Sequence, residues 1–292
     1  MKSRPVKSRP IKSRPVDQTP DKTAPALPLA GQRVLVTRPA LQANALCAAL
    51  SARGAQAIRF PTLSIRPIDE DDSSYQSLKN CFLDLDRYSA VIFISANAAQ
   101  IGVDWIDQYW PQLPTHILWF AVGAATGRTL EQLGLPVTEA AGTMDSEALL
   151  ALPQLSRLDN SRILICRGQA GRERLRQDLQ QRGANVDYAE LYHREIPVYS
   201  QAEIESIIYK SAASAILVSS GEVLINLIKL TQRPESGIST LSDTPLVVPS
   251  QRVATLAQQH HFNHIEVAAN ATDTAMIAAL EALIATQGGA EH

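Results

Sequence analysis

The sequence predicts an α/β protein made of two similar lobes, each a doubly wound parallel sheet, with a cleft between the lobes. Short apolar segments rich in β-branched residues alternate with amphipathic segments of helical period, which is typical of parallel sheets covered by helices on both faces. At 292 residues the chain has room for about two domains. It also repeats itself, since three segments recur in the same order: 33–57 as 162–186, 93–105 as 217–229, and 140–152 as 268–280.

The first repeat opens with the buried strand RVLVT at 33–37. An amphipathic helix follows and ends at Gly54, a residue that favours helix termination. Pro61 and Pro67 then bracket an extended connector, and Gly134 ends a later helix. The remaining elements expected in this repeat are helix 40–53, strand 56–60, helix 74–84, strand 90–95, helix 97–108, strand 116–123, helix 125–133, a short strand ending at Val137, and helix 145–152.

The second repeat is expected to have the same alternation of strands and helices as the first. Its first strand, RILIC at 162–166, is again apolar and β-branched, and Gly183 again ends the following helix. The expected elements after that strand are helix 170–182, strand 185–192, helix 201–210, strand 215–220, helix 221–230, strand 245–250, helix 251–260, strand 264–267 and helix 273–286. Right-handed crossovers between parallel strands would make each lobe an open, doubly wound sheet.

Residues 1–30 form a basic, proline-rich arm in which the unit KSRPV/I occurs three times. Proline at this frequency is incompatible with helices and central strands, so the arm is expected to be disordered or polyproline-like. One interpretation is an arm that contacts a partner, and the other is a solvated extension. Because the formal net charge of the chain is −2, the remainder is acidic, which argues against general nucleic-acid binding.

The sequence lacks the motifs of membrane proteins, zinc proteins and nucleotide-dependent enzymes. No apolar run approaches the roughly 20 residues that a membrane span needs. Cys47, Cys81 and Cys166 form no CxxC pair or zinc spacing, and buried thiols in a reducing cytoplasm are expected. Dinucleotide, P-loop, nucleophile-elbow and HExxH motifs are missing, so no metal or nucleotide cofactor is expected.

Polar residues cluster where the predicted strands lead into helices. In doubly wound sheets, ligands bind beyond the carboxyl ends of the strands, and helix N-termini there attract carboxylates or phosphates. Each hydroxyl has the alternative role of a plain helix cap. The candidate ligand contacts are Arg38, Ser95, Asn97, Gly123, Thr126, Arg167, Gly168, Ser219, Ser220, Ser250 and Arg252.

Arg38 and Arg167 occupy the same position in the two repeats, directly after the first strand. An arginine there either holds a ligand carboxylate in a bidentate contact or pairs with an acidic residue of its own lobe. The residues alone therefore predict a two-lobed protein that binds an anion.

The motifs VLVTRP (34–39), FISANAA (93–99), VGAATGRTL (122–130), GTMDSEALL (142–150), ILICRG (163–168), LYHR (191–194) and TDTAMIAAL (272–280) carry a resemblance. In this order and spacing, the chain resembles the uroporphyrinogen-III synthases over about 33–286. The resemblance implies a cytoplasmic, cofactor-free lyase of tetrapyrrole biosynthesis. It would dehydrate and cyclise hydroxymethylbilane, a linear tetrapyrrole with eight carboxylates, while inverting the last pyrrole ring.

The resemblance also implies a domain division that differs from one lobe per repeat. Lobe one would hold 33–61 plus 198–288, and lobe two would hold 68–191. Two extended connectors, 62–67 and 192–197, would run side by side between the lobes. A monomer is expected, and the basic arm could serve for docking to pathway enzymes.

Residue by residue, the resemblance implies that Tyr192 donates a proton, although packing with a satisfied hydroxyl is its alternative role. Ser95, Thr126, Ser219 and Ser250 match positions that line the cleft. Two departures are present, because Arg252 stands where some relatives have threonine and SSG at 219–221 replaces a Ser-Pro form. A two-lobed binding or sensor protein that does not turn its anionic ligand over remains the alternative function.

Overall fold

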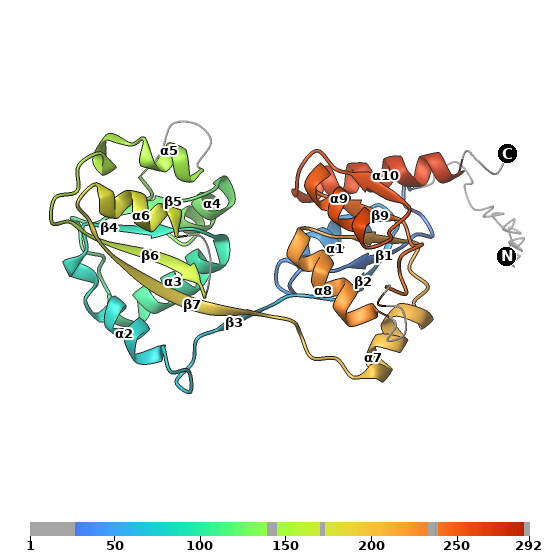
Figure 1. Ribbon diagram of the computed structural model, residues 1–292, viewed down its shortest axis with the longest axis horizontal. Coiled ribbons are helices and arrows are strands. Elements are labelled where there is room, and N and C mark those ends of the chain that lie inside the picture. Colours follow the sequence, from blue (N-terminus) through green and yellow to red (C-terminus); the bar gives the residue numbers. More distant parts are fainter. Residues whose placement is uncertain (1–26, 139–144, 170–172, 233–236, 238, 289–292) are drawn as a thin grey trace, which may run out of the picture.

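The computed structural model describes residues 27–138, 145–169, 173–232, 237 and 239–288, and it contains two five-stranded sheets, each covered by helices (Figure 1). The α/β class predicted from the alternating pattern is confirmed. We call the part around the sheet β10-β9-β8-β1-β2 lobe one and the part around the sheet β3-β7-β6-β4-β5 lobe two.

Lobe one is a fully parallel sheet that joins strands from both repeats. The first repeat supplies β1 (Arg33–Val36) and β2 (Gln56–Arg59). The second repeat supplies β8 (Ala215–Leu217), β9 (Leu246–Val248) and β10 (Ile265–Val267). Because β1 pairs with β8, the order reverses between them, and this switch point is where such sheets bind ligands.

Lobe two repeats this arrangement with the contributions exchanged. The first repeat supplies β4 (Ala90–Phe93) and β5 (Leu118–Ala121), and the second supplies β6 (Arg162–Gly168) and β7 (Asn185–Glu195). The switch point lies between β4 and β6, which pair in parallel. The short strand expected to end at Val137 is reduced to a single bridge with Trp119, at the position that β10 occupies in lobe one.

Helices cover both faces of each sheet. On lobe one, α1 (Ala43–Ser51) and α10 (Asp273–Gly288) bury Leu46, Leu50 and Leu280 on one face. The other face is covered by α8 (Gly221–Thr231) and α9 (Gln251–Gln259), with α7 (Gln201–Glu205) and a π-helical turn at 206–210 beyond them. On lobe two, α2 (Tyr75–Leu83), α3 (Ala96–Tyr109) and α4 (Ala124–Gln132) lie opposite α5 (Ser146–Leu150) and α6 (Arg174–Gln181).

Two extended segments connect the lobes and pair with each other (Figure 1). The strand β3 (Ser64–Pro67) runs antiparallel to the end of β7, from Ser64 opposite Glu195 to Pro67 opposite Tyr192. Lobe two is therefore not purely parallel, and β7 is three residues longer than the expected strand 185–192. Pairing with β3 satisfies backbone groups that a bare connector would expose, which explains the extension.

The expected disordered arm, 1–30, lies outside the described residues except for its last four. For these the expectation is wrong, because Leu29 is fully buried and its N–H donates to the Arg53 carbonyl at 2.9 Å. An apolar residue in a proline-rich segment can thus belong to the core of lobe one. The helix expected at 40–53 is also shorter, since residues 40–42 form a turn in which the Ala43 N–H donates to the Pro39 carbonyl at 3.1 Å.

Candidate active site

A polar pocket of about 340 Å³ lies between the lobes, beside the switch point of lobe one. The Thr37 hydroxyl ties this edge together by donating to the Leu217 carbonyl at 2.7 Å. Four sequence-predicted residues meet here, since Arg38 follows β1, Ser219 and Ser220 follow β8, and Asn97 comes from α3 of lobe two. The full lining is Arg38, Pro39, Gln42, Leu63, Ile65, Asn97, Arg194, Ser219, Ser220, Val223 and Ala271.

Both arginines of the polar pocket are paired within the protein. Arg38 donates to the Asp273 carboxylate and to the Ala271 carbonyl, the latter at 2.5 Å. Arg194, on β7, donates to both carboxylate oxygens of Glu222, with Nε at 3.3 Å from Oε1. Of the two roles open to Arg38, pairing with an acid of its own lobe is therefore what the structure has. The guanidinium groups are held at the pocket wall, and each keeps donors in excess of those that one carboxylate uses.

An apolar pocket of about 500 Å³ adjoins the polar pocket and is also lined by both lobes. Its lining residues are Pro39, Ala40, Leu41, Gln42, Pro61, Leu63, Ser64, Ile65, Pro67, Asn97, Gln100, Ile101, Asp104, Pro197 and Tyr199. Gln42 and Asn97 line both pockets and connect the lobes, because the Gln42 amide donates to Asn97 Oδ1 at 2.9 Å. Polar and apolar recognition surfaces thus lie next to each other between the lobes.

Tyr192 and Ser95 meet at the switch point of lobe two. Tyr192 lies on β7 and is 2% exposed, and its hydroxyl oxygen is 3.0 Å from Ser95 Oγ. Ser95 is also the N-cap of α3 and accepts a hydrogen bond from the Ala98 N–H at 3.0 Å. Two predicted site residues are therefore in direct contact, and the Ser95 hydroxyl combines capping with a second polar contact.

Gly168 allows this contact because its lack of a side chain lets the Tyr192 ring pack directly against its backbone. A Cβ atom at position 168 would be 2.4 Å from Tyr192 Cε2 and 2.6 Å from Cζ. Gly168 and Tyr192 are also partners in the β6–β7 register, at a shift of that register. The predicted role of Gly168 as a ligand contact thus has a local physical alternative, which is close approach by a neighbouring ring.

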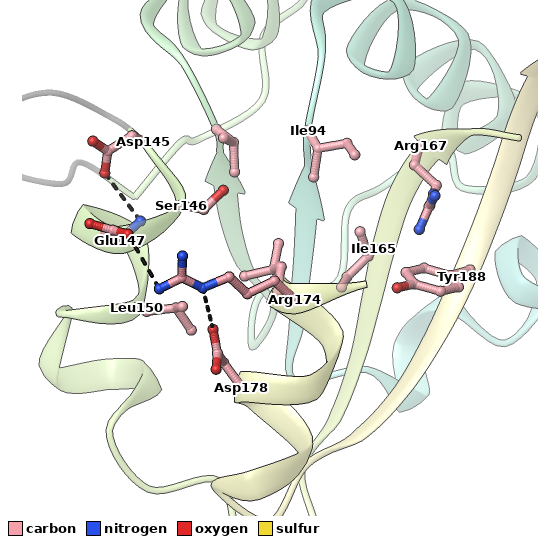
Figure 2. A pocket seen from close by; sticks show the side chains of 12 residues that line it. Ile94, Asp145, Ser146, Glu147, Leu150, Ile165, Arg167, Arg174, Asp178 and Tyr188 are labelled. Carbon is pink, nitrogen blue, oxygen red and sulfur yellow. Dashed lines mark hydrogen bonds and ion pairs between the residues drawn. The ribbon is translucent and has the colours of Figure 1, made fainter. Parts of the chain in front are cut away.

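Arg167 lies away from the two pockets described above, in a pocket of about 510 Å³ within lobe two (Figure 2). Its guanidinium lies over the Tyr188 ring, 4.5 Å from the centroid, and donates to Glu173 at 3.2 Å. Hydrogen bonds from Tyr188 and Arg167 lower the pKa of Glu173, the former being the larger cause. On the opposite wall Arg174 pairs with Glu147 and Asp178 (Figure 2). Like Arg38, Arg167 pairs with an acid of its own lobe.

The remaining predicted site residues line neither pocket between the lobes. Gly123 precedes α4 with φ of +90°, a conformation that favours glycine, and Thr126 is buried in the first turn of that helix. Ser250 precedes α9, and Arg252 lies exposed in its first turn, with Nη1 3.6 Å from the position of a Cβ atom at Gly221. These residues lie at helix starts, as expected, but the structure does not bring them to Arg38 and Asn97.

Sequence reasoning missed Gln42 and Arg194. Arg194 follows Tyr192 by two residues on the same strand, so the two side chains share a face, and period-two alternation was the available signal. His193 lies on the other face, where it contacts Asp72 at 2.8 Å. The hydrogen bond from Arg66 is the largest cause that lowers the pKa of Asp72. This second face joins the connector to the segment before α2 and leaves the Arg194 face to the pockets.

Membrane spans and metal sites are both absent from the described residues. Within them, no helix is both long and apolar enough to cross a membrane. The same residues contain no group of three or more histidine, cysteine or acidic side chains arranged to hold a metal ion.

The chain matches known proteins over most of its length. Residues 44–278 match the family described as "Uroporphyrinogen-III synthase HemD". The uroporphyrinogen-III synthase of Salmonella typhimurium is 32% identical over 254 residues, covering 85% of this chain and 99% of that protein. The Escherichia coli enzyme of the same name is 31% identical over 252 residues, with the same coverage.

Solved structures share the fold at low identity. A uroporphyrinogen III synthase from Thermus thermophilus superposes with a TM-score of 0.56 at 15% identity, covering 87% of this chain and 99% of that chain. The uroporphyrinogen-III synthetase of Helicobacter pylori gives 0.55 at 12% identity, covering 86% and 99%. These likenesses concern the fold.

Proposed function

Because the chain belongs to the uroporphyrinogen-III synthase family, it is a lyase of porphyrin biosynthesis, and we propose that it binds hydroxymethylbilane between its two lobes. The reaction removes water from the linear tetrapyrrole and closes the ring with inversion of the last pyrrole. The observation that carries the proposed binding site is the pair of adjoining pockets that both lobes line, one polar with two arginines and one apolar.

Recognition in this proposal rests on Arg38 and Arg194. Each guanidinium donates some of its N–H groups to a carboxylate of the protein. A substrate carboxylate can accept from the remaining N–H groups, or it can displace Asp273 or Glu222. Ser219, Ser220 and Asn97 add polar contacts at the same wall. The apolar pocket beside them suits the pyrrole rings, whose faces carry no charge.

The dehydration step needs a proton donor more than a strong base. Loss of the hydroxymethyl hydroxyl leaves an azafulvene, and protonation of that hydroxyl turns it into water as the C–O bond breaks. Tyr192 is the proposed donor, supported by its contact with Ser95 at the end of the lobe-two sheet. A phenol is a modest acid, and assistance from the pyrrole nitrogen, which pushes the leaving group out, reduces the acid strength that the step requires.

Ring inversion is proposed to depend on positioning. The azafulvene carbon can be attacked by two different carbons of the last pyrrole, and attack at the substituted carbon gives a spiro intermediate that rearranges to the inverted ring. Holding the folded chain against two walls selects that carbon, because orientation of reacting groups alone can change rates by many orders of magnitude. Contacts from both lobes give such a folded arrangement, which supports a site at the Gln42–Asn97 junction.

The domain division 33–61 plus 198–288 and 68–191, with connectors 62–67 and 192–197, is retained as part of the proposal. It is supported by the exchange of strands between the repeats and by the antiparallel pairing of β3 with β7. We further propose a cytoplasmic monomer, for which three free thiols are consistent. Docking to pathway enzymes would fall to the arm, whose first 26 residues lie outside the described structure.

An isomer assay tests the function. Purified full-length protein is supplied with enzymatically generated hydroxymethylbilane, and the porphyrins are resolved after oxidation. The proposal expects the type III isomer in excess over the type I isomer that forms spontaneously. If only type I appears while the protein still binds the tetrapyrrole, the alternative of a non-catalytic anion-binding protein replaces it. Full activity after removal of residues 1–26 would restrict the arm to a docking role.

A further inference from the structure

The hydroxyl groups of Tyr192 and Ser95 form a pair in which Ser95 is the more exposed partner. Tyr192 is 2% exposed, its ring is held against Gly168, and its hydroxyl is directed at Ser95 Oγ, 3.0 Å away. Ser95 is half-buried and lies two residues before Asn97, which lines both pockets between the lobes. Neither side chain lines those pockets, and of the two hydroxyl-bearing residues the half-buried Ser95 is the more exposed.

The hydrogen bonds of Ser95 restrict what its hydroxyl can do, and either oxygen can donate in its contact with Tyr192. A serine oxygen has two lone pairs and one hydrogen. One lone pair accepts from the Ala98 N–H at 3.0 Å, as the N-cap of α3 requires. If the second accepts from the Tyr192 hydroxyl, both lone pairs are used and the serine hydrogen is free to point away from the pair. This arrangement makes Ser95 the outward donor and Tyr192 the group that resupplies its proton.

The duplication shows that lobe one lacks this pair. At the position equivalent to Tyr192, 129 residues earlier by the alignment of 33–57 with 162–186, the first repeat has Leu63. Leu63 is buried and has no hydroxyl, and the serine that caps α8 in lobe one is Ser220, which accepts from the Val223 N–H at 3.3 Å. Capping serines thus occur in both lobes, whereas among the described residues a tyrosine hydroxyl contacts the capping serine in lobe two alone. Capping of a helix by serine therefore does not by itself explain why a tyrosine hydroxyl contacts Ser95.

We propose that Ser95 is the residue that touches the leaving hydroxyl and that Tyr192 acts through it, as a two-member proton relay; this rests on the proposed function. As the C–O bond of the hydroxymethyl group breaks, the Ser95 proton passes to the departing oxygen and the Tyr192 proton passes to Ser95 Oγ. The products are water, a cationic azafulvene and a tyrosinate. The ring carbon that closes the macrocycle later loses its proton, and that proton returns through Ser95 to Tyr192, so the enzyme is restored.

Variants of the pair test the relay. Ser95→Asn keeps a strong N-cap acceptor but removes the hydroxyl, whereas Ser95→Thr keeps both. We expect Ser95→Asn and Tyr192→Phe each to lower the single-turnover rate about 100-fold, Ser95→Thr to retain most of it, and the double variant to be no slower than the slower single variant. The relay would be overturned if the rate reduction in the double variant equalled the product of the two single reductions. It would also be overturned if Ser95→Asn reacted at the wild-type rate.

A solvent isotope measurement separates the relay from a structural role. In mixtures of H₂O and D₂O, two protons in flight make the wild-type single-turnover rate a curved function of deuterium content, and Tyr192→Phe should make it linear. A linear wild-type dependence contradicts the relay. Ser200→Ala, which removes the N-cap serine of α7, a side chain that lines neither pocket, controls for cap loss and should keep both rate and curvature. Wild-type formation of the type III isomer tests the proposed function separately, because it can hold while the relay fails.

Discussion

Substitution of Gly168 by alanine tests the lobe-two site through packing alone. The new Cβ would be 2.4 Å from Tyr192 Cε2, 2.6 Å from Cζ and 3.0 Å from Cδ2, whereas ordinary van der Waals contact begins at 3.4 Å. The ring therefore has to retreat by about 1 Å, and it is 2% exposed with little free space around it. The Tyr192–Ser95 contact of 3.0 Å would lengthen beyond hydrogen-bonding distance.

The expected cost has two parts. Overpacking a well-filled core typically destabilises by about 1–3 kcal/mol. Loss of the buried hydroxyl contact adds about 1 kcal/mol, so the free energy of unfolding of Gly168→Ala should be about 2–4 kcal/mol lower than that of the wild type. Activity should fall more steeply than stability suggests, because a displacement of about 1 Å at a reacting group can lower the rate about 100-fold.

Urea unfolding and the isomer assay measure the two effects. Gly102→Ala is the matched packing control, because its Cβ would be 2.7 Å from Phe93 Cε1 in the same lobe without touching Tyr192. Both variants should lose stability, but only Gly168→Ala should lose most of the type III activity at a temperature where both are folded. A Gly168→Ala protein with wild-type stability and rate would refute the packing argument. Equal activity losses in the two variants would refute its link to Tyr192.

Three further predictions concern recognition, acid stability and thiol reactivity. Arg38→Ala should raise KM about tenfold with a smaller change in kcat, because one charge-assisted contact is lost; an unchanged KM would make Arg38 a structural partner of Asp273 only. Because the folded-state pKa of Asp72 is lowered by Arg66, its stabilising contribution is complete above about pH 4 and is lost as the pH falls further. The urea midpoint difference between wild type and Asp72→Asn should therefore shrink from pH 5 to pH 2, and a constant difference would contradict this. Burial raises the pKa of the Cys166 thiol well above its usual value, so a water-soluble disulfide reagent should label Cys166 only on unfolding, as mass spectrometry of native and denatured protein would reveal.

The alternating pattern predicted most of the elements because it depends on local physics. Strands such as 33–36 and 162–168 are buried on both faces and read as continuous apolar runs, and the glycines at 54 and 183 adopt the positive φ expected at helix ends. The exchange of strands between repeats could not come from that pattern. Pairing of β1 with β8 joins residues far apart in the chain, and periodicity carries no information about which strand lies beside which.

The site was predicted in parts for the same reason. Residues at strand ends were identifiable, and Arg38, Asn97, Ser219 and Ser220 do line one pocket. Arg194 was overlooked because it lies on a connector that pairs as a strand, a contact made only through β3. The pairing of Arg38 with Asp273 was likewise left open, since Asp273 begins a helix at the other end of the chain.

Hydrogen exchange read by mass spectrometry tests most directly whether the tetrapyrrole binds between the lobes, as we propose. Exchange of the full-length protein is compared with and without saturating uroporphyrinogen III, the product, under reducing conditions. We expect simultaneous protection of backbone amides at the start of α3, 95–104, and at the start of α8, 219–224, one segment from each lobe. Protection confined to lobe two, around Arg167 and Tyr188, would contradict it and place the ligand in the pocket within that lobe.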